Sequence, residues 1–424
     1  MPSRRLVRVG SSHSTQILGT QSMTGLKRLA TMLAVLTSTL PLAAAAEDAA
    51  LPPGTFLIPG TDTTLNVYGF VEVDATYDLD GRTSDINNFD WASFLAVQPF
   101  DNLGVAEPMK RQVFITGRAS RLGVMSNTPT PLGALTVRLE ADFVAPNTFQ
   151  GELATNSTAF RLRHAYGQLG GLLIGQTWST FFDGESTPDT VDFNPAAALA
   201  LMRQPVARYT FSFSPEASLA LAIENPQSLT FSKDYDAVPD FIGAFRYGGK
   251  WGHVSARAVT HEFRTTEHTR RAYGVGLSGS LKFANETLVA AVQGGDGIGR
   301  YMFNSLLQGA FDTGDQLELW RSYAYHIGLT HSWSPALRSN VIWTQTFFAE
   351  NDRLEAAQRA FSEGAGTTDF IPNKRIDQLF VNTFWKFTKN TEVGLEYTYG
   401  KRTTFGPEKG TMHRVNALAR FSLY

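Results

Sequence analysis

The chain has 424 residues, of which 43% are hydrophobic, 12% aromatic and only 18% charged, and its formal net charge is −2. A charged share below that of a typical soluble domain, together with 37 glycines, favours many strands joined by glycine-rich turns over a helical enzyme. The lack of cysteine excludes a thiolate nucleophile, a cysteine zinc site and a disulfide framework. A slightly acidic balance without any basic run argues against nucleic acid as a partner.

The first 46 residues have the pattern of an export signal. Residues 23–28 carry two positive charges, residues 29–42 are apolar, and the alanines at 44–46 form a cleavage site of the A-x-A type. We expect cleavage before Glu47, which removes five basic residues and no acidic one and so changes the net charge from −2 to −7. Translation from Met23 is an alternative start. An uncleaved anchor is disfavoured because the apolar run is shorter than the ~20 residues of a spanning helix.

Beyond residue 64, apolar and polar side chains alternate along the chain. In residues 65–79, Leu65 and Val67 share one face while Glu72 and Asp74 share the other, as in a half-buried strand. The same alternation continues through the chain to its end. Sixteen segments are expected as strands: 65–79, 111–126, 134–144, 159–169, 172–180, 207–214, 217–225, 240–248, 251–263, 271–283, 286–296, 320–332, 337–349, 376–387, 391–402 and 412–424.

The connections between these segments alternate in length. Every second one is a tight turn, whereas most of the others are long, including 80–110, 145–158, 297–319 and 350–375. Short periplasmic turns alternating with long extracellular loops are typical of transmembrane barrels. We therefore predict an all-β fold: a transmembrane antiparallel β-barrel of about 16 strands at 65–424. A signal peptide at 1–46 and a periplasmic N-terminal segment at 47–64 precede it.

The third long connection, residues 181–207, is far longer than the two to five residues of a hairpin turn. Its first half is acidic, and its second half contains the apolar run 196–202, which must be buried against something. In a barrel wide enough to hold water the inner wall is available, so we expect the loop to fold into the pore as a constriction. The candidate residues of this constriction loop are Asp183, Glu185, Asp189, Asp192 and Arg203.

Arginines dominate the polar face of the predicted strands. Inward arginines in a narrow aqueous pore concentrate anions, and the guanidinium fork suits carboxylates. The alternative is that these arginines pair with the acidic loop and hold it in place. The predicted pore-lining or substrate-binding residues are Arg118, Arg138, Arg161, Arg163, Arg208, Arg246 and Arg257.

Two motifs that could carry chemistry lack the necessary context. His261-Glu262 begins like a zinc-protease helix, but the second histidine is missing at Thr265, and the segment 294–299 is a glycine-rich run that opens no helix. We predict no catalytic residue, no metal site and no cofactor. The alternative functions are a barrel enzyme of the outer membrane and a non-conducting adhesion barrel. Helical spacing in 350–361 predicts a short loop helix, with a partner-binding helix as the alternative.

Several segments of the chain resemble the DcaP-like porins of Gram-negative outer membranes. The resemblance implies a homotrimeric porin of sixteen strands whose third loop narrows the pore, set among outer-membrane lipid and lipopolysaccharide. It also implies uptake of small anionic solutes such as dicarboxylates. Residues 47–65 are too short and proline-rich for the coiled coil that some members carry. The segments that carry the resemblance are 56–70, 115–123, 161–169, 174–183, 188–194 and 203–212.

Overall fold

The computed structural model describes residues 51–80, 111–144, 159–193, 198–302, 308–366 and 371–424. The chain divides into two units, Met1–Leu51 and Pro52–Tyr424, and all the elements below belong to the second. The predicted signal peptide and nearly all of the loops predicted at 80–110 and 145–158 lie outside the described residues. No helix in the described ranges is long and apolar enough to cross a membrane.

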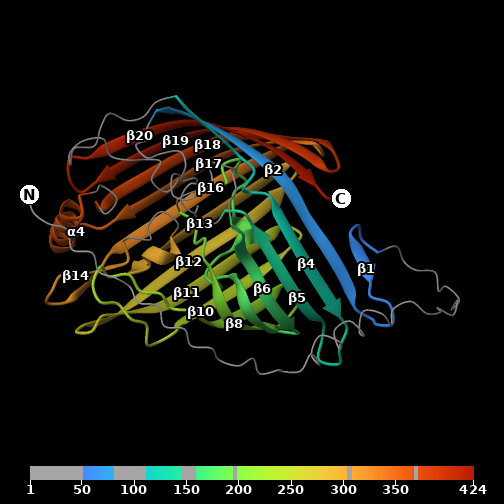
Figure 1. The fold of residues 1–424 in the computed structure, drawn as a ribbon, viewed down its shortest axis with the longest axis horizontal. Coiled ribbons are helices and arrows are strands. Elements are labelled where there is room, and N and C mark those ends of the chain that lie inside the picture. The colour runs from blue at the N-terminus through green and yellow to red at the C-terminus, as the bar shows by residue number, and fades with distance from the viewer. Residues whose placement is uncertain (1–50, 81–110, 145–158, 194–197, 303–307, 367–370) are drawn as a thin grey trace, which may run out of the picture. The chain divides into compact units, whose positions relative to one another are not determined.

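The second unit consists almost entirely of antiparallel strands, most of them paired with their neighbours in the chain (Figure 1). The last strand, β20, pairs with β2, so the sheet closes on itself. Sixteen strands form this barrel if β3 and β4 are counted as two halves of one strand and β1, β14 and β15 are left out. The elements are β1 (Thr55–Leu57), β2 (Thr64–Asp80), β3 (Gln112–Thr116), β4 (Arg121–Thr128), β5 (Leu135–Asp142), β6 (Arg161–Leu169), β7 (Leu172–Trp178), η1 (Gly184–Ser186), β8 (Arg203–Ser212), β9 (Ala217–Glu224), β10 (Asp240–Gly249), β11 (Gly252–Arg264), β12 (Thr269–Phe283), β13 (Glu286–Asp296), η2 (Gly299–Tyr301), β14 (Ala310–Asp312), β15 (Leu317–Leu319), β16 (Arg321–Ser334), β17 (Leu337–Phe348), α4 (Asp352–Gly364), β18 (Asn373–Thr388), β19 (Thr391–Thr404) and β20 (Lys409–Ser422).

The predicted barrel is confirmed, and its strand boundaries agree with the prediction to within a few residues. The largest difference at a strand end is in β8, which begins at Arg203 instead of residue 207. The helix predicted on the loop after residue 350 is α4. The predicted N-terminal segment contains β1, which pairs with the start of β2. Tight turns join the strands at one end of the barrel, the turn end, and the longer connections lie at the other, the loop end, where Figure 1 shows α4 and β14.

One predicted strand, 111–126, is broken between β3 and β4. The Ser120 N–H donates to the Gly117 carbonyl at 3.1 Å, which makes a turn, and the Ser120 hydroxyl accepts the Glu72 N–H of β2 at 3.0 Å, where a ladder bond would otherwise form. In β3 the even-numbered Phe114 and Thr116 are buried, whereas in β4 the odd-numbered Gly123 is buried and Leu122 and Val124 are exposed. The break therefore reverses which residues point inward.

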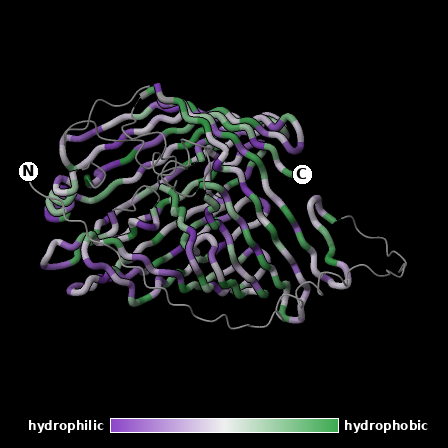
Figure 2. The backbone as a smooth tube through the Cα atoms, in the orientation of Figure 1, coloured by the Kyte–Doolittle hydropathy of each residue, from purple (hydrophilic) through white to green (hydrophobic). Residues whose placement is uncertain are grey.

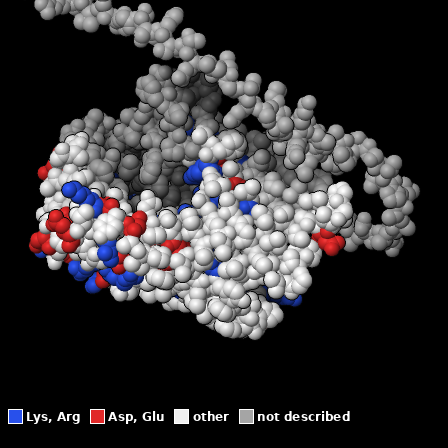
Figure 3. Space-filling view, turned by 60° about the horizontal axis from the view of Figure 1, so that its bottom comes forward, with Lys and Arg blue, Asp and Glu red and all other residues white. Residues whose placement is uncertain are grey.

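The two faces of the sheet differ in polarity. Along β12, Val275 and Leu277 are more than half exposed, while Ser278 and Ser280 are buried on the other face. The alternation of hydropathy is visible along most strands in Figure 2. In Figure 3 the outer wall carries a broad, mostly uncharged band, and charged residues gather at the end where α4 and β14 lie. An apolar outer band with a polar interior is the pattern required of a barrel in a membrane.

A charge placed on the outer wall is expected to destabilise the barrel. Leu277 is 60% exposed and faces outward from β12. Leu277→Arg should lower the free energy of unfolding from bilayers by about 2–4 kcal/mol if this position lies near the bilayer midplane. The measurement is a denaturant titration in lipid vesicles, with Leu277→Ala as the control for lost apolar contact. Equal losses in the two variants would contradict the assignment of this face to lipid.

Candidate functional site

The segment that follows β7 lies against the inward-facing side chains of β10–β12. Asp183 accepts hydrogen bonds from the Ser278 hydroxyl and from His253 Nε2, the latter at 2.8 Å. Burial raises the pKa of Asp183, but these two hydrogen bonds lower it by more, so its pKa lies below the ordinary value. Glu185 of η1 pairs with Arg246 through both carboxylate oxygens, at 2.6 and 2.8 Å. The start of the loop is thus fixed by charge-assisted contacts.

The next part of the loop crosses to the opposite part of the strand order. Its hydrogen bonds and ion pairs are made with polar side chains of the inner face. They join the Ser186 carbonyl with His326 Nε2 of β16 at 2.9 Å, Asp189 with Arg338 of β17 at 2.7 Å, the N–H groups of Val191 and Asp192 with Glu396 of β19 at 2.9 Å each, and Asp192 with Arg414 of β20 at 3.1 Å. These partners belong to strands that are not adjacent to β7. The loop therefore extends across the interior of the barrel.

The apolar half of the loop is also buried on the inner wall. Leu199 packs with Ile342 of β17 and Phe380 of β18, both fully buried. Gln293 of β13 donates to the Ala198 carbonyl at 2.7 Å. The run 198–202 thus packs against apolar side chains inside the barrel. This agrees with the prediction that the apolar run is buried on the inner wall.

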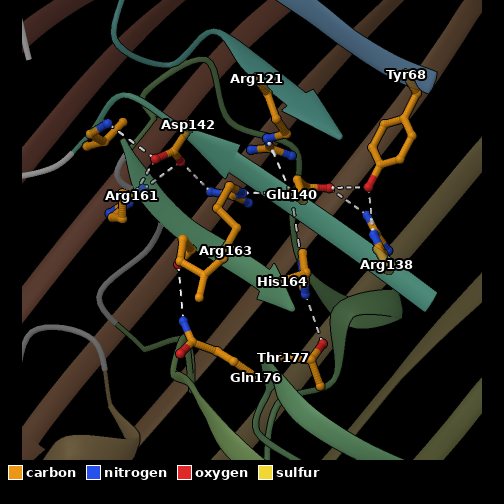
Figure 4. A network of polar contacts seen from close by, with 12 residues as sticks. Tyr68, Arg121, Arg138, Glu140, Asp142, Arg161, Arg163, His164, Gln176 and Thr177 are labelled. Carbon is orange, nitrogen blue, oxygen red and sulfur yellow. Dashed lines mark hydrogen bonds and ion pairs between the residues drawn. The ribbon is translucent and has the colours of Figure 1, made fainter. Parts of the chain in front are cut away.

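A second group of polar residues lies on the inner face of β2 and β4–β6, and we call it the basic cluster (Figure 4). Four arginines in it surround two carboxylates, those of Glu140 and Asp142 on β5. Tyr68 joins the cluster by donating to Glu140 at 3.0 Å and accepting from Arg138 at 2.7 Å. The ion pairs are Arg121–Glu140 at 3.5 Å, Arg138–Glu140 at 2.6 Å, Arg163–Glu140 at 2.7 Å, Arg163–Asp142 at 2.8 Å and Arg161–Asp142 at 2.8 Å.

The density of arginine in the basic cluster depends on a local irregularity. The pairing of β5 with β6 shifts register after Glu140, because Glu140 lies opposite His164 and Ala141 lies opposite Leu162. Arg163 is the extra residue of this bulge. Arg161 and Arg163 therefore both reach Asp142 from one side of the sheet, at 2.8 Å each.

The seven predicted pore-lining arginines have different places in the structure. Arg138, Arg161 and Arg163 belong to the basic cluster. Arg246 and Arg257 hold the loop, the latter by donating to the Phe181 carbonyl at 2.6 Å. Arg208 follows the inward parity of β8, between the exposed side chains of residues 207 and 209. Arg118 is buried at the break between β3 and β4.

Among the predicted loop residues, Arg203 differs from the acidic ones. It begins β8 and places its guanidinium 4.5 Å from the centre of the Trp178 ring. The inward arginines that the sequence analysis missed include Arg121 and Arg338. Arg121 lies on the same face of its strand as the buried Gly123, and Arg338 on the same face as the buried Asn340. The period-two pattern could therefore have indicated both, but the break between β3 and β4 hid the inward position of Arg121.

Three loop and wall residues could share a metal ion by their spacing. Ligand atoms of Asp183, Glu185 and His253 lie within 4.8 Å of one another. Each is already engaged: Arg246 takes both oxygens of Glu185, and His253 donates to Asp183. These contacts hold the loop against the inner wall.

At the loop end, Leu354 of α4 is fully buried and packs with Trp320 and Phe348, and polar contacts add to this attachment. Gln358 of α4 accepts a hydrogen bond from Trp320 at 2.9 Å, and Arg359 pairs with Glu408, in the turn between β19 and β20, at 2.5 and 2.8 Å. Burial raises the pKa of Glu408, but hydrogen bonds from Arg359 and Thr404 outweigh this and lower the pKa to about 2.

Docking of α4 should therefore resist acid. Because the folded pKa of Glu408 is depressed, its contribution is present above the unfolded value of about 4.3 and is lost as the pH falls through about 2. Pepsin, which is active in this range, should cleave within α4 near pH 2 and much more slowly near pH 4. In Arg359→Gln the protection at pH 4 should decrease, while the apolar contacts of Leu354 remain. Equal cleavage of both proteins at pH 4 would show that this ion pair does not hold the helix.

The architecture defines the class of protein. A closed barrel of sixteen antiparallel strands with an apolar outer band, a charged interior and a loop laid across that interior is the architecture of outer-membrane porins. The chain belongs to the DcaP outer membrane protein family, whose model matches residues 55–423. This agrees with the resemblance noted in the sequence and places the chain among outer-membrane channel proteins rather than enzymes.

Individual relatives agree with this assignment. The outer membrane channel DcaP of Acinetobacter baumannii superposes with a TM-score of 0.73 at 23% identity, over 87% of this chain and 99% of that one. An anion-selective porin from Comamonas acidovorans gives a TM-score of 0.55 at 10% identity, over 85% and 100% of the two chains. Porin Omp2b of Brucella canis is 26% identical over 212 residues, 48% of this chain. The chain thus matches about half of the length of that porin (52%).

Proposed function

We propose that the chain is a passive diffusion channel of the outer membrane that favours small anions, dicarboxylates among them. The observation that carries the proposal is the excess of positive charge in the basic cluster, where four arginines share two carboxylates. Guanidinium groups bind carboxylates through two parallel hydrogen bonds, and a charged wall raises the local concentration of counter-ions. The A. baumannii relative is described as a channel, and the C. acidovorans porin is described as anion-selective.

The exposure of these arginines supports an open, water-filled lumen. The side chains of Arg121, Arg138 and Arg161 face inward, yet they are 24%, 30% and 31% exposed. Solvent therefore reaches them from within the barrel. A non-conducting adhesion barrel would gain nothing from such a surface.

The loop and the basic cluster have separate roles in this proposal. The acidic residues of the loop are neutralised by the arginines that anchor it, such as Arg246 and Arg338. The basic cluster does not depend on those residues for its partners. The loop narrows the passage, and the cluster selects the charge of what passes.

Planar-bilayer recording tests the proposal. Purified, folded protein should give discrete conductance steps. In a salt gradient, the sign of the reversal potential should show that anions permeate more readily than cations. Steps that occur in threes would support the homotrimer that the resemblance implies. Folded protein that never conducts, or that conducts with cation selectivity, would contradict the proposal.

A further inference from the structure

A groove of about 640 Å³ lies on the outer wall between β7 and β12. Its floor is formed by three small outward residues, Ala207, Gly243 and Ala258. Larger outward side chains border it, among them Leu221, Phe241 and Tyr273, which are 49%, 44% and 61% exposed. The lining is almost entirely apolar. This face belongs to the uncharged band of the outer wall.

The groove follows from the register of the strands. Leu221 lies opposite Gly243, and Gly243 opposite Ala258, so two small residues adjoin across β10 and β11. One row nearer the loop end, Phe241 lies opposite Thr260, and Thr260 opposite Tyr273. Gly243 and Ala258 in one row, and Ala207 in the next, leave a hollow between larger side chains that crosses several strands.

A charged group borders the groove on its loop-end side. Arg271, two residues before Tyr273 on β12, donates to the hydroxyl of Thr260 in the groove wall at 3.0 Å. Arg271 and Arg264 also share the carboxylate of Glu262, at 3.2 and 2.8 Å. Two guanidinium groups therefore face one carboxylate, and both arginine side chains are 29% exposed. The apolar groove thus ends at a site of net positive charge.

We propose that this groove binds one acyl chain of a phosphate-bearing membrane lipid, whose headgroup pairs with Arg264 and Arg271. The inference rests on the outer-membrane location of the barrel and is independent of what the pore conducts. An acyl chain fits a groove with almost no polar lining, and it can lie over the small residues of the floor. The phosphate supplies the negative charge that Glu262 leaves unmatched at the loop-end border.

Native mass spectrometry of the full chain, folded in detergent, tests the site. The probes are dimyristoyl phosphatidylglycerol, which is anionic, and dimyristoyl phosphatidylcholine, which has the same chains but no net charge. The first molecule of phosphatidylglycerol should bind at least about tenfold more tightly than the first molecule of phosphatidylcholine. This ratio of dissociation constants corresponds to about 1.4 kcal/mol. Arg271→Gln should reduce that preference towards unity without preventing binding of either lipid.

Filling the groove should abolish the bound lipid. Ala258→Phe is expected to weaken retention of both lipids about tenfold or more, whereas Ala256→Phe, outward on the same strand but outside the groove, should behave as the wild type. Gly243→Leu fills the groove from β10 and serves if Ala258→Phe fails to fold. The conductance of all these variants should stay unchanged, because the residues face away from the lumen.

Three outcomes would overturn the proposal. Equal loss of lipid in Ala256→Phe and Ala258→Phe would indicate an unspecific lipid layer. Dissociation of an oligomer in Ala258→Phe would assign the groove to a neighbouring copy of the chain. A wild type that does not distinguish the two lipids would remove the headgroup site. Folded wild-type protein that does not conduct, by contrast, would contradict only the proposed channel function.

Discussion

Deletion of residues 184–198 should raise the single-channel conductance about twofold or more, because a sixteen-stranded barrel without an obstruction encloses an aqueous channel. The deleted segment includes η1 and the contacts of Asp189 and Asp192 with β17 and β20. These contacts hold it across the interior, so its removal widens the passage at that level. The measurement is planar-bilayer recording of the variant beside the wild type.

The barrel itself should tolerate this deletion. Two of the anchoring arginines keep a carboxylate of the wall: Arg338 pairs with Glu392 at 2.6 Å, and Arg414 pairs with Asp78 at 2.6 Å. No buried charge is therefore left alone at these positions, which would otherwise cost several kcal/mol. Retained heat resistance on a gel is the control for folding. An unchanged conductance in a folded variant would mean that the loop does not limit the current.

Replacing Arg138 and Arg161 together by glutamine should shift the reversal potential in a salt gradient toward that of cations. These side chains are the more exposed members of the basic cluster, at 30% and 31%, whereas Arg163 is buried and bridges both carboxylates. The change leaves two arginines for two carboxylates. A unit charge at ~4 Å is worth about 4 kcal/mol at an effective dielectric near 20. Screening at physiological salt acts over about 8 Å, so the field persists only close to the wall.

The matched control places the same charge change at the rim. Arg321 and Arg353 pair with Asp296 and Asp315 at the loop end, and the two arginine side chains are 57% and 44% exposed. The double change of Arg321 and Arg353 to glutamine should leave the reversal potential close to that of the wild type, because the rim is screened by salt. Permeation of succinate should slow in the Arg138 and Arg161 variant more than that of a neutral solute. Equal shifts in the two double variants would contradict a selective role for the basic cluster.

Much of the fold could be predicted from the sequence because its determinants are local. Period-two alternation, as in residues 65–79, requires only that one face of each strand meets lipid and the other water. The tight turns and long connections fix the topology of neighbouring strands. The length and composition of residues 181–207 also predicted a loop that folds into the barrel, and this prediction did not require knowledge of the residues that it contacts.

The tertiary structure alone decided which arginine does what. The break at 117–120 and the bulge at Arg163 each shift the inward parity by one residue, and no period-two pattern contains them. The partners of the loop are equally non-local: Asp189 meets Arg338 and Asp192 meets Arg414, about 150 and 220 residues along the chain. Such pairs depend on closure of the barrel, which brings β17 and β20 within reach of a loop that begins at β7. Sequence patterns could therefore predict inward arginines, while only the closed sheet separated those that anchor the loop from those in the basic cluster.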